Sequence, residues 1–349
     1  MTVLGDDVVV RPVRRDDLPG LIRLAEGTGT GLTTLPACGQ ALGLRIERSL
    51  AAFSSRAEEA DGDCYLMVLE DAATGSVVGT SGIFAGVGLS KAFYSYRILT
   101  LTKASADLGV KVDTRILQLV NDYAGATEVG TLYLAPGYRR HGNGGLLARC
   151  RYLMMAGFRR RFPELVLAEI RGWQDADGRP PFWEAIGRHF FRMSFERADL
   201  LSGLGNSQFI ADLMPKHPIY VDLLPKNAQD AIGRPHEAAR PALRLLESEG
   251  FRFGRAVDIF DAGPVVDVRR DDIRTVRESR EVEIAGLASA RDGLVPHLAA
   301  TVDMEGFRVA RTLVRLRDDG RIDMDAGAAR RLGVGAGDRI RIVAEEMKA

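Results

Sequence analysis

The stretch from residue 127 to residue 162 constrains the fold of this chain more than any other part of the sequence. It opens with the apolar run TEVGTLYLAP, which is typical of a buried strand. Pro136 and Gly137 mark a turn, and the basic loop RRHGNGG follows at residues 139–145. An amphipathic helical pattern then runs from Leu146 to Phe162. The sequence therefore predicts a strand, a glycine-containing basic loop and a helix, in that order.

This order favours an anion site at the start of the helix. Unpaired N–H groups and the helix dipole attract negative charge there, and glycine lets a phosphate approach the backbone. We expect Gly142 and Gly144 to bind a pyrophosphate, with Arg139 and Arg140 as charge partners. A bulky residue in place of Gly142 should weaken this binding and leave folding nearly intact. The alternative is an ordinary strand–helix turn that binds nothing.

Known phosphate loops help to choose a ligand. The loop matches neither G-x-G-x-x-G nor G-x-x-x-x-G-K-[ST], so dinucleotides and nucleoside triphosphates fit poorly. The pattern Arg139-x-x-Gly142-x-Gly144 after a strand resembles the acyl-CoA loop of the GCN5-related N-acetyltransferase superfamily. The opening RPVR, followed by a helix that Asp16 or Asp17 can cap, resembles the same superfamily. The resemblance implies an α/β (α+β) fold built on a mixed sheet.

Composition narrows the function classes. The chain has 349 residues, of which 46% are hydrophobic and 27% charged, with a formal net charge of zero. A large basic surface for nucleic acid is therefore not indicated, and no apolar run is long enough to cross a membrane. The three scattered cysteines and five histidines show no disulfide framework and no metal-ligand spacing. We expect a cytoplasmic enzyme without a metal.

The rest of the chain divides into two expected units. Residues 1–262 alternate strands and helices, whereas residues 263–349 suit a small barrel-like β module that serves packing or assembly. Within the first unit we expect a hairpin at 64–70 and 76–87, strands at 93–101 and 165–170, helices at 182–193, 207–214 and 238–249, and closing strands at 251–253 and 256–260.

Longer strings, in the same order, resemble one enzyme family, arginine N-succinyltransferase. They are GLTTLPA (31–37), TLYLAPGYRRHGNGGLL (131–147), AEIRGWQDADGRPPFWEAIGRHFF (168–191), MPKHPIYVDLLP (214–225), AQDAIGRPHEAARPA (228–242) and EGFRFGRAVDIFDAGP (249–264). The resemblance covers essentially the whole chain. It implies transfer of a succinyl group from the co-substrate succinyl-CoA to the α-amino group of L-arginine, the first step of an arginine degradation route. Some members form heteromers of two related subunits and also accept L-ornithine, so we expect a homo- or hetero-oligomer.

The resemblance also implies roles for two residues. Leu132 stands where the family contacts succinyl-CoA, and His236 where it places a proton donor. From the residues alone, Leu132 is a core side chain and His236 is a surface histidine or a cap for the helix near Ala238. The general base could be either Glu128 or Glu169, which we expect on neighbouring strands. Direct acyl transfer needs no cysteine nucleophile, and Cys150 should be inert.

Two other functions stay open. One is acetyl transfer from acetyl-CoA to a different amine. The other is a non-catalytic subunit of a heteromer that binds acyl-CoA. The choice of acyl donor separates the first from succinyl transfer, and release of free CoA by the purified chain separates the second.

Overall fold

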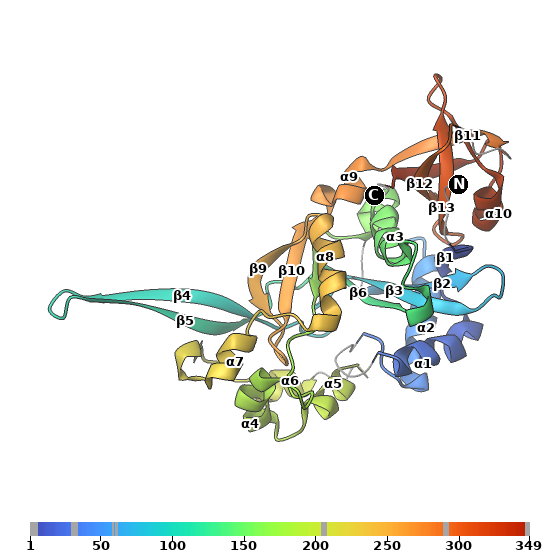
Figure 1. The fold of residues 1–349 in the computed structure, drawn as a ribbon. Coiled ribbons are helices and arrows are strands. Elements are labelled where there is room, and N and C mark those ends of the chain that lie inside the picture. The colour runs from blue at the N-terminus through green and yellow to red at the C-terminus, as the bar shows by residue number, and fades with distance from the viewer. Residues whose placement is uncertain are drawn as a thin grey trace.

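The computed structural model describes residues 6–28, 34–57, 59, 62–203, 208–288 and 293–345. A long main sheet and a C-terminal barrel are its two β structures (Figure 1). The main sheet has the strand order β1-β2-β3-β6-β7-β10-β9-β4-β5-β8. Its strands are β1 (Val8–Pro12), β2 (Asp63–Asp71), β3 (Val77–Ala85), β4 (Ser95–Ser105), β5 (Val110–Val120), β6 (Thr127–Leu134), β7 (Leu165–Glu169), β8 (Ile219–Tyr220), β9 (Arg252–Val257) and β10 (Pro264–Arg269).

The main sheet is mixed, which confirms the predicted fold class. β6 and β7 pair in parallel, because α3 crosses over between them, and the other pairings of the main sheet are antiparallel. The helices around it are α1 (Leu18–Glu26), α2 (Gly39–Ser54), α3 (Asn143–Gly157), α4 (Arg188–Phe191), α5 (Phe195–Gly203), α6 (Gln208–Leu213), α7 (Lys226–Ala231), α8 (Arg240–Ser248) and α9 (Arg274–Glu278).

Strand alternation sends side chains to two different cores. Leu66 and Val68 of β2 pack with α1 and α2, whereas Met67 and Leu69 of the same strand pack in the cluster that contains α3. Helices therefore cover both faces of the sheet at β2. A third core joins β4 and β5 to the aromatic side chains around Trp183.

The C-terminal barrel is closed. Its strand order is β12-β15-β11-β14-β13, and an additional pairing between β12 and β13 completes the ring. The strands are β11 (Arg280–Ala288), β12 (Val295–Thr301), β13 (Val309–Leu316), β14 (Ile322–Asp325) and β15 (Arg339–Ala344), with α10 (Ala326–Leu332) packed against them. One residue pair, Val10 and Val309, connects the ring to β1.

The boundary between the two units differs from the expected one. β10 lies after residue 262 yet inserts between β7 and β9 of the main sheet, and α9 contacts α3. Strand pairing therefore assigns residues 263–279 to the first unit. We propose that the division falls between α9 and β11.

The helix α3 is not the amphipathic surface helix that its charges suggest. Its two faces contact the main sheet and the barrel, and side chains from Leu298 to Val343 join its core cluster. Arg149 and Arg151 are consequently buried. Arg149 Nε donates to Thr275 Oγ1 at 2.8 Å and lies 3.3 Å from Glu249, whereas Arg151 Nε donates to the Ala148 carbonyl. The helix also ends at Gly157, before the expected Phe162.

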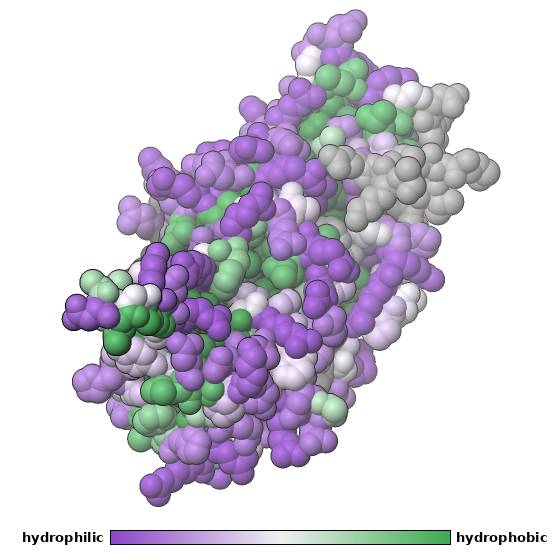
Figure 2. All heavy atoms as spheres, turned by 60° about the vertical axis from the view of Figure 1, so that its left-hand side comes forward, coloured by the Kyte–Doolittle hydropathy of each residue, from purple (hydrophilic) through white to green (hydrophobic). Residues whose placement is uncertain are grey.

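β4 and β5 form a two-stranded arm that projects from the body of the protein (Figure 1). The partner strand, residues 110–120, was missing from the sequence prediction, because its outer half, VKVDTR, is exposed and lacks an apolar run. Leu99, Leu108, Val110 and Val112 are exposed on the arm. Figure 2, in which this side comes forward, shows apolar patches on a largely hydrophilic face.

Three local predictions need correction. The Asp17 carboxylate does not cap α1; it accepts hydrogen bonds from buried Arg11 at 2.7 and 2.8 Å. The helix expected at 238–249 begins only at Arg240, which places Pro241 in the first turn of α8. The two expected closing strands are the single strand β9, in which Arg255 has φ 61°.

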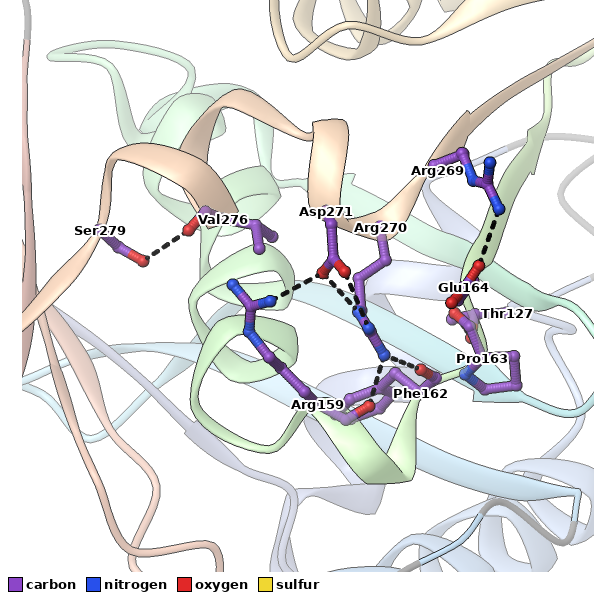
Figure 3. Close-up of polar contacts among 10 residues, drawn as sticks. All are labelled: Thr127, Arg159, Phe162, Pro163, Glu164, Arg269, Arg270, Asp271, Val276 and Ser279. Carbon is purple, nitrogen blue, oxygen red and sulfur yellow. Dashed lines mark hydrogen bonds and ion pairs between the residues drawn. The ribbon is translucent and has the colours of Figure 1, made fainter.

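Arg270 holds the crossover between α3 and β7 in place (Figure 3). Its Nη1 donates to the carbonyls of Arg159 and Phe162 at 2.6 Å each, and its Nε donates to Asp271. The guanidinium is 12% exposed. Next to it, Arg269 pairs with Glu164 at 2.9 Å with both side chains largely exposed.

We expect Arg270→Ala to lower the free energy of unfolding by about 2–4 kcal/mol, because the carbonyls of Arg159 and Phe162 lose a charged donor whose own side chain is largely buried. Arg269→Ala is the matched control, with an expected loss of under about 1 kcal/mol for an exposed pair. Urea unfolding followed by tryptophan fluorescence measures both variants. Equal stability of the two variants would contradict the assignment.

Candidate active site

The site begins where β6 and β7 stop pairing. Only Thr127 with Val166 and Glu128 with Leu167 are paired between these strands, although β6 continues to Leu134. On its other edge β6 stays paired with β3 up to Leu134. The second half of β6 therefore turns one edge toward a gap in the sheet, where its backbone groups have no strand partner.

A β-bulge shapes β6 at this gap. Gly130 pairs with Gly82 and Tyr133 with Thr80, so that Thr131 and Leu132 together oppose Ser81. Thr131 has φ 56°, a strained conformation for a β-branched residue. Thr34 stabilises it: the Thr131 N–H donates to Thr34 Oγ1 at 3.0 Å, and Thr131 Oγ1 donates to the Thr34 carbonyl at 3.2 Å. Thr34 belongs to the string GLTTLPA, whose residues 31–33 lie outside the described part of the chain.

Leu132 and His236 lie on opposite sides of the gap. Leu132 is half-buried directly after the strained residue of the bulge. Arg171 lies two residues beyond the end of β7, so it belongs to the segment on the other side of the gap. The His236 N–H donates to the Arg171 carbonyl at 2.8 Å, and Pro235 bridges to Gly172. His236 is thus attached to the segment that follows β7, and Leu132 lies on the unpaired half of β6.

The hydrogen bonds of His236 fix its tautomer. Its Nδ1 accepts the Ala238 N–H at 3.1 Å, and this is the helix-cap contact of the alternative interpretation. A neutral ring with an occupied Nδ1 lone pair carries its proton on Nε2. Partial burial and, secondarily, the nearby Arg171 charge lower the pKa of His236 below its usual 6.5. His236 is therefore a cap and, at neutral pH, a neutral Nε2–H donor.

A cluster of buried carboxyl groups lies at β6, β7 and the loop before β10. Burial, opposed by the Arg45 charge, raises the pKa of Glu128 to about 7. Burial, with a further contribution from the neighbouring acids, raises the pKa of Glu169 well above its usual value. Burial is also the main reason that the pKa values of Asp258 and Asp261 are raised. The pKa of Glu128 thus lies near neutrality, where a carboxyl group can exchange a proton with a substrate.

The glycine loop has the geometry of an anion site. Gly142 precedes α3 with φ 74°, and the N–H groups of His141, Gly142 and Gly144 donate to no acceptor among the described residues. A side chain at Gly144 would meet nothing within 4 Å. A Cβ at Gly142 would instead approach Arg311 Nη2 to 2.6 Å. The expectation that replacing Gly142 leaves folding intact is therefore wrong, because both the φ angle and Arg311 oppose it.

The two loop arginines are already engaged with protein groups. Arg140 forms an ion pair with Asp6 at 2.8 Å, and the same carboxylate accepts from Asn143. Arg139 Nε donates to the Leu134 carbonyl at 2.9 Å, and its guanidinium stacks over Tyr133. Both side chains are exposed at the loop. Their role as phosphate partners stays a prediction.

Similarity to known proteins decides the family. A model of the arginine N-succinyltransferase beta subunit matches residues 8–275, and a model of its C-terminal domain matches residues 280–344. The chain belongs to the arginine N-succinyltransferase family. An arginine N-succinyltransferase from Escherichia coli O127:H6 is 43% identical over 98% of this chain and all of its own length, and the one from strain K12 is equally similar.

A solved structure agrees with this family and with the fold. Subunit AI of the arginine/ornithine succinyltransferase from Pseudomonas aeruginosa superposes with a TM-score of 0.88 at 34% identity, covering 97% of this chain and 99% of its own. The two family models meet between residues 275 and 280, which is where strand pairing also separates the main sheet from the barrel. The chain is thus an acyltransferase built on a mixed α/β sheet.

Other chemistries find little support in the described residues. They contain no group of three or more His, Cys, Asp or Glu side chains arranged to hold a metal ion. No helix among them is both long and apolar enough to span a membrane. Cys150 is fully buried, and burial raises the pKa of its thiol to about 12, so it carries no thiolate at neutral pH.

Sequence reasoning missed several residues of this site. Arg45 of α2 donates to the Thr34 carbonyl and stabilises the charged form of Glu128, yet it reads as an ordinary helix arginine. Asp258 and Asp261 lie in the string AVDIFDAGP, which carries the family resemblance and predicts a strand at 256–260 but no role for the two acids. Acids within an apolar segment were the signal that could have identified them.

We expect Gly144→Leu to raise the apparent dissociation constant of CoA by about tenfold or more, since the side chain would occupy the ligand's place beside a free N–H. Folding should be unaffected or slightly more stable, because the residue is helical and faces open space. Gly43→Leu in α2, also helical with open space, is the matched control. Calorimetric titration with CoA measures both, and an unchanged constant for Gly144→Leu would refute the phosphate site.

Proposed function

We propose that this protein transfers the succinyl group of succinyl-CoA to the α-amino group of L-arginine. The observation that carries the proposal is the gap between β6 and β7, which Leu132 and His236 flank in a chain of this family. Succinyl-CoA is a co-substrate that binds and leaves at each turnover. The carboxyl cluster favours a cationic acceptor, which L-arginine and L-ornithine both are.

The acyl donor follows the free edge of β6. Its pyrophosphate binds to the N–H groups of Gly142 and Gly144, with Arg139 and Arg140 at the rim. The amide-bearing arm of CoA runs along the unpaired edge of β6, as an added strand does at a sheet edge. The thioester carbonyl then reaches the backbone at Leu132 after the bulge, where an N–H can polarise it.

Glu128 is the proposed general base. It lies on β6 two residues before Gly130, and a Cβ at Gly130 would be 3.4 Å from Glu128 Oε1, so the carboxyl group lies close to the bulge. A base with a pKa near the working pH is the most effective. It takes a proton from the arginine ammonium. The free amine then attacks the thioester carbon, and the carbon–sulfur bond breaks to release CoA thiolate.

His236 is the proposed donor to the departing sulfur. In the tautomer set by Ala238, Nε2–H donates a hydrogen bond to the developing thiolate without losing its own proton. Full transfer from a doubly protonated ring would first require Nδ1 to give up the Ala238 N–H. The thiolate then takes its proton from the attacking amine or from solvent.

The setting of the enzyme is also part of the proposal. The cysteines in the chain are unpaired, which suits the reducing cytoplasm where succinyl-CoA is made and used. The solved relative is named as one subunit of its enzyme. We infer that this chain works as an oligomer, either with copies of itself or with a related subunit.

The direct test uses the purified chain. With succinyl-CoA and L-arginine it should release CoA and form succinylarginine, with acetyl-CoA far less active as donor. The kcat should fall as pH decreases through about 7, because Glu128 must be ionised, and Glu128→Gln should remove that inflection and lower kcat by about a hundredfold or more. No CoA release from any acyl-CoA with arginine would end the proposal and favour a non-catalytic subunit. Preference for acetyl-CoA would favour the acetyltransferase alternative.

Substitutions at His236 separate its two roles. Asn keeps an acceptor near the position of Nδ1 but lacks Nε2, so His236→Asn should keep its thermal stability and lose about 10²- to 10⁴-fold in kcat. His236→Gln places an amide N–H near Nε2 but loses the cap, so it should keep more activity and lose about 1 kcal/mol of stability. Both melting temperature and kcat are measured on each variant.

His236→Ala serves as the reference that loses both groups. The affinity for succinyl-CoA should stay close to that of the wild type in all three variants, because the cap and the donor act at the acyl end. A stable His236→Asn variant with normal kcat would show that the histidine is only a cap.

A further inference from the structure

Arg171 is a half-buried cation that the proposed mechanism does not yet use. Its backbone is held firmly directly after β7: its carbonyl accepts the His236 N–H at 2.8 Å, and the next N–H, of Gly172, donates to Asp261 Oδ2 at 2.7 Å. The side chain is half-buried, and the charges of Asp261 and Asp199 act on it. A guanidinium in this position is expected to bind an anion.

The neighbouring Gln174 also has a buried N–H donor without an acceptor among the described residues. Arg171 Nη2 donates to Gln174 Oε1 at 2.6 Å, so the two side chains are in contact. Gln174 is 8% exposed, and its Nε2 has no hydrogen-bond partner in the part of the chain that the structure describes. Arg171 Nε is buried and unpartnered in the same way. Two adjacent buried donors without acceptors indicate an absent ligand that accepts hydrogen bonds.

The position of these donors selects the ligand. Arg171 directly follows β7 at the gap, and its carbonyl is bound to His236, the residue proposed to meet the leaving sulfur. The acyl group of the donor must therefore lie beside it. A planar guanidinium with an amide N–H beside it suits a carboxylate, which accepts several hydrogen bonds at once.

We propose that Arg171 and Gln174 bind the terminal carboxylate of the succinyl group and so select succinyl-CoA over uncharged acyl donors. This inference rests on the proposed function. Arginine, the acceptor, also carries a carboxylate, and the same chemistry could hold it. The acyl carboxylate is favoured because Arg171 neighbours His236, whereas the buried acids Glu128 and Glu169 lie toward the paired part of β6 and β7.

The test compares dissociation constants for succinyl-CoA and butyryl-CoA, which differ by a carboxylate in place of a methyl group. Wild type should bind succinyl-CoA more tightly, and Arg171→Met should reduce that preference by about 10- to 100-fold, the loss expected for a charged hydrogen bond. Gln174→Met, which keeps the charge and loses the amide donor, should reduce it by a smaller factor. Arg179→Met, an exposed arginine of the same loop paired with Asp177, is the control and should leave it unchanged.

Calorimetry without acceptor keeps the result independent of the reaction. Equal binding of both donors by the wild type, or an equal loss for both in Arg171→Met and Gln174→Met, would overturn the inference. An unchanged preference with a raised KM for arginine would also overturn it, and would assign Arg171 to the acceptor carboxylate. A wild type that prefers succinyl-CoA but does not succinylate arginine would uphold the inference and refute the proposed acceptor.

Discussion

The unpaired edge of β6 is the constraint on which the site depends. A parallel strand pair normally continues until one strand ends, yet β6 and β7 separate after two residue pairs. The N–H and C=O groups beyond that point must find other partners, because leaving them unpaired and buried carries a free-energy cost. Thr34 takes over part of this role at Thr131. The bulge, the strained φ angle and the unpaired edge are therefore parts of one feature, the second half of β6. An extended ligand can pair with β6 there and complete the sheet.

Charge is distributed across this gap in a way that fits two oppositely charged substrates. Carboxyl groups gather around β6, β7 and Asp261, and burial raises their pKa values. For Glu128, where the Arg45 charge opposes this effect, the pKa is about 7. Beside Asp261, Arg171 contributes positive charge that helps to lower the pKa of His236. An incoming ammonium thus meets Glu128, whose pKa suits proton transfer near neutral pH. An incoming carboxylate meets Arg171 and Gln174, each of which has a buried N–H group without an acceptor among the described residues.

The sequence predicted the features that depend on local patterns. The strand–loop–helix unit, the β2–β3 hairpin and the barrel all follow from apolar periodicity and turn residues that no distant contact overrides. It failed where a distant element decides the outcome. Arg149 and Arg151 suggest a solvated face on α3, but the barrel covers that face and the two arginines find buried partners. β10 comes after the expected boundary at residue 262, but it pairs with the edge of β7 and so belongs to the main sheet. The separation of β6 from β7 is likewise a tertiary feature that no pattern within either strand encodes.

The barrel is also part of the site, because it holds the glycine loop in shape. His141 and Gly142 both adopt positive φ angles, which for the histidine is unfavourable by about 1–2 kcal/mol. A chain of contacts offsets this strain: Arg140 binds Asp6, Asp6 binds Asn143, and Asn143 accepts from Arg311 of β13, which Glu345 holds in turn. Arg311 Nη2 lies against Gly142, where any larger residue would displace it. A loop fixed in this way has little freedom left to lose when an anion binds. The barrel therefore contributes to affinity through the shape of the loop, and this explains why a unit without catalytic groups is packed against the helix that begins at the phosphate site.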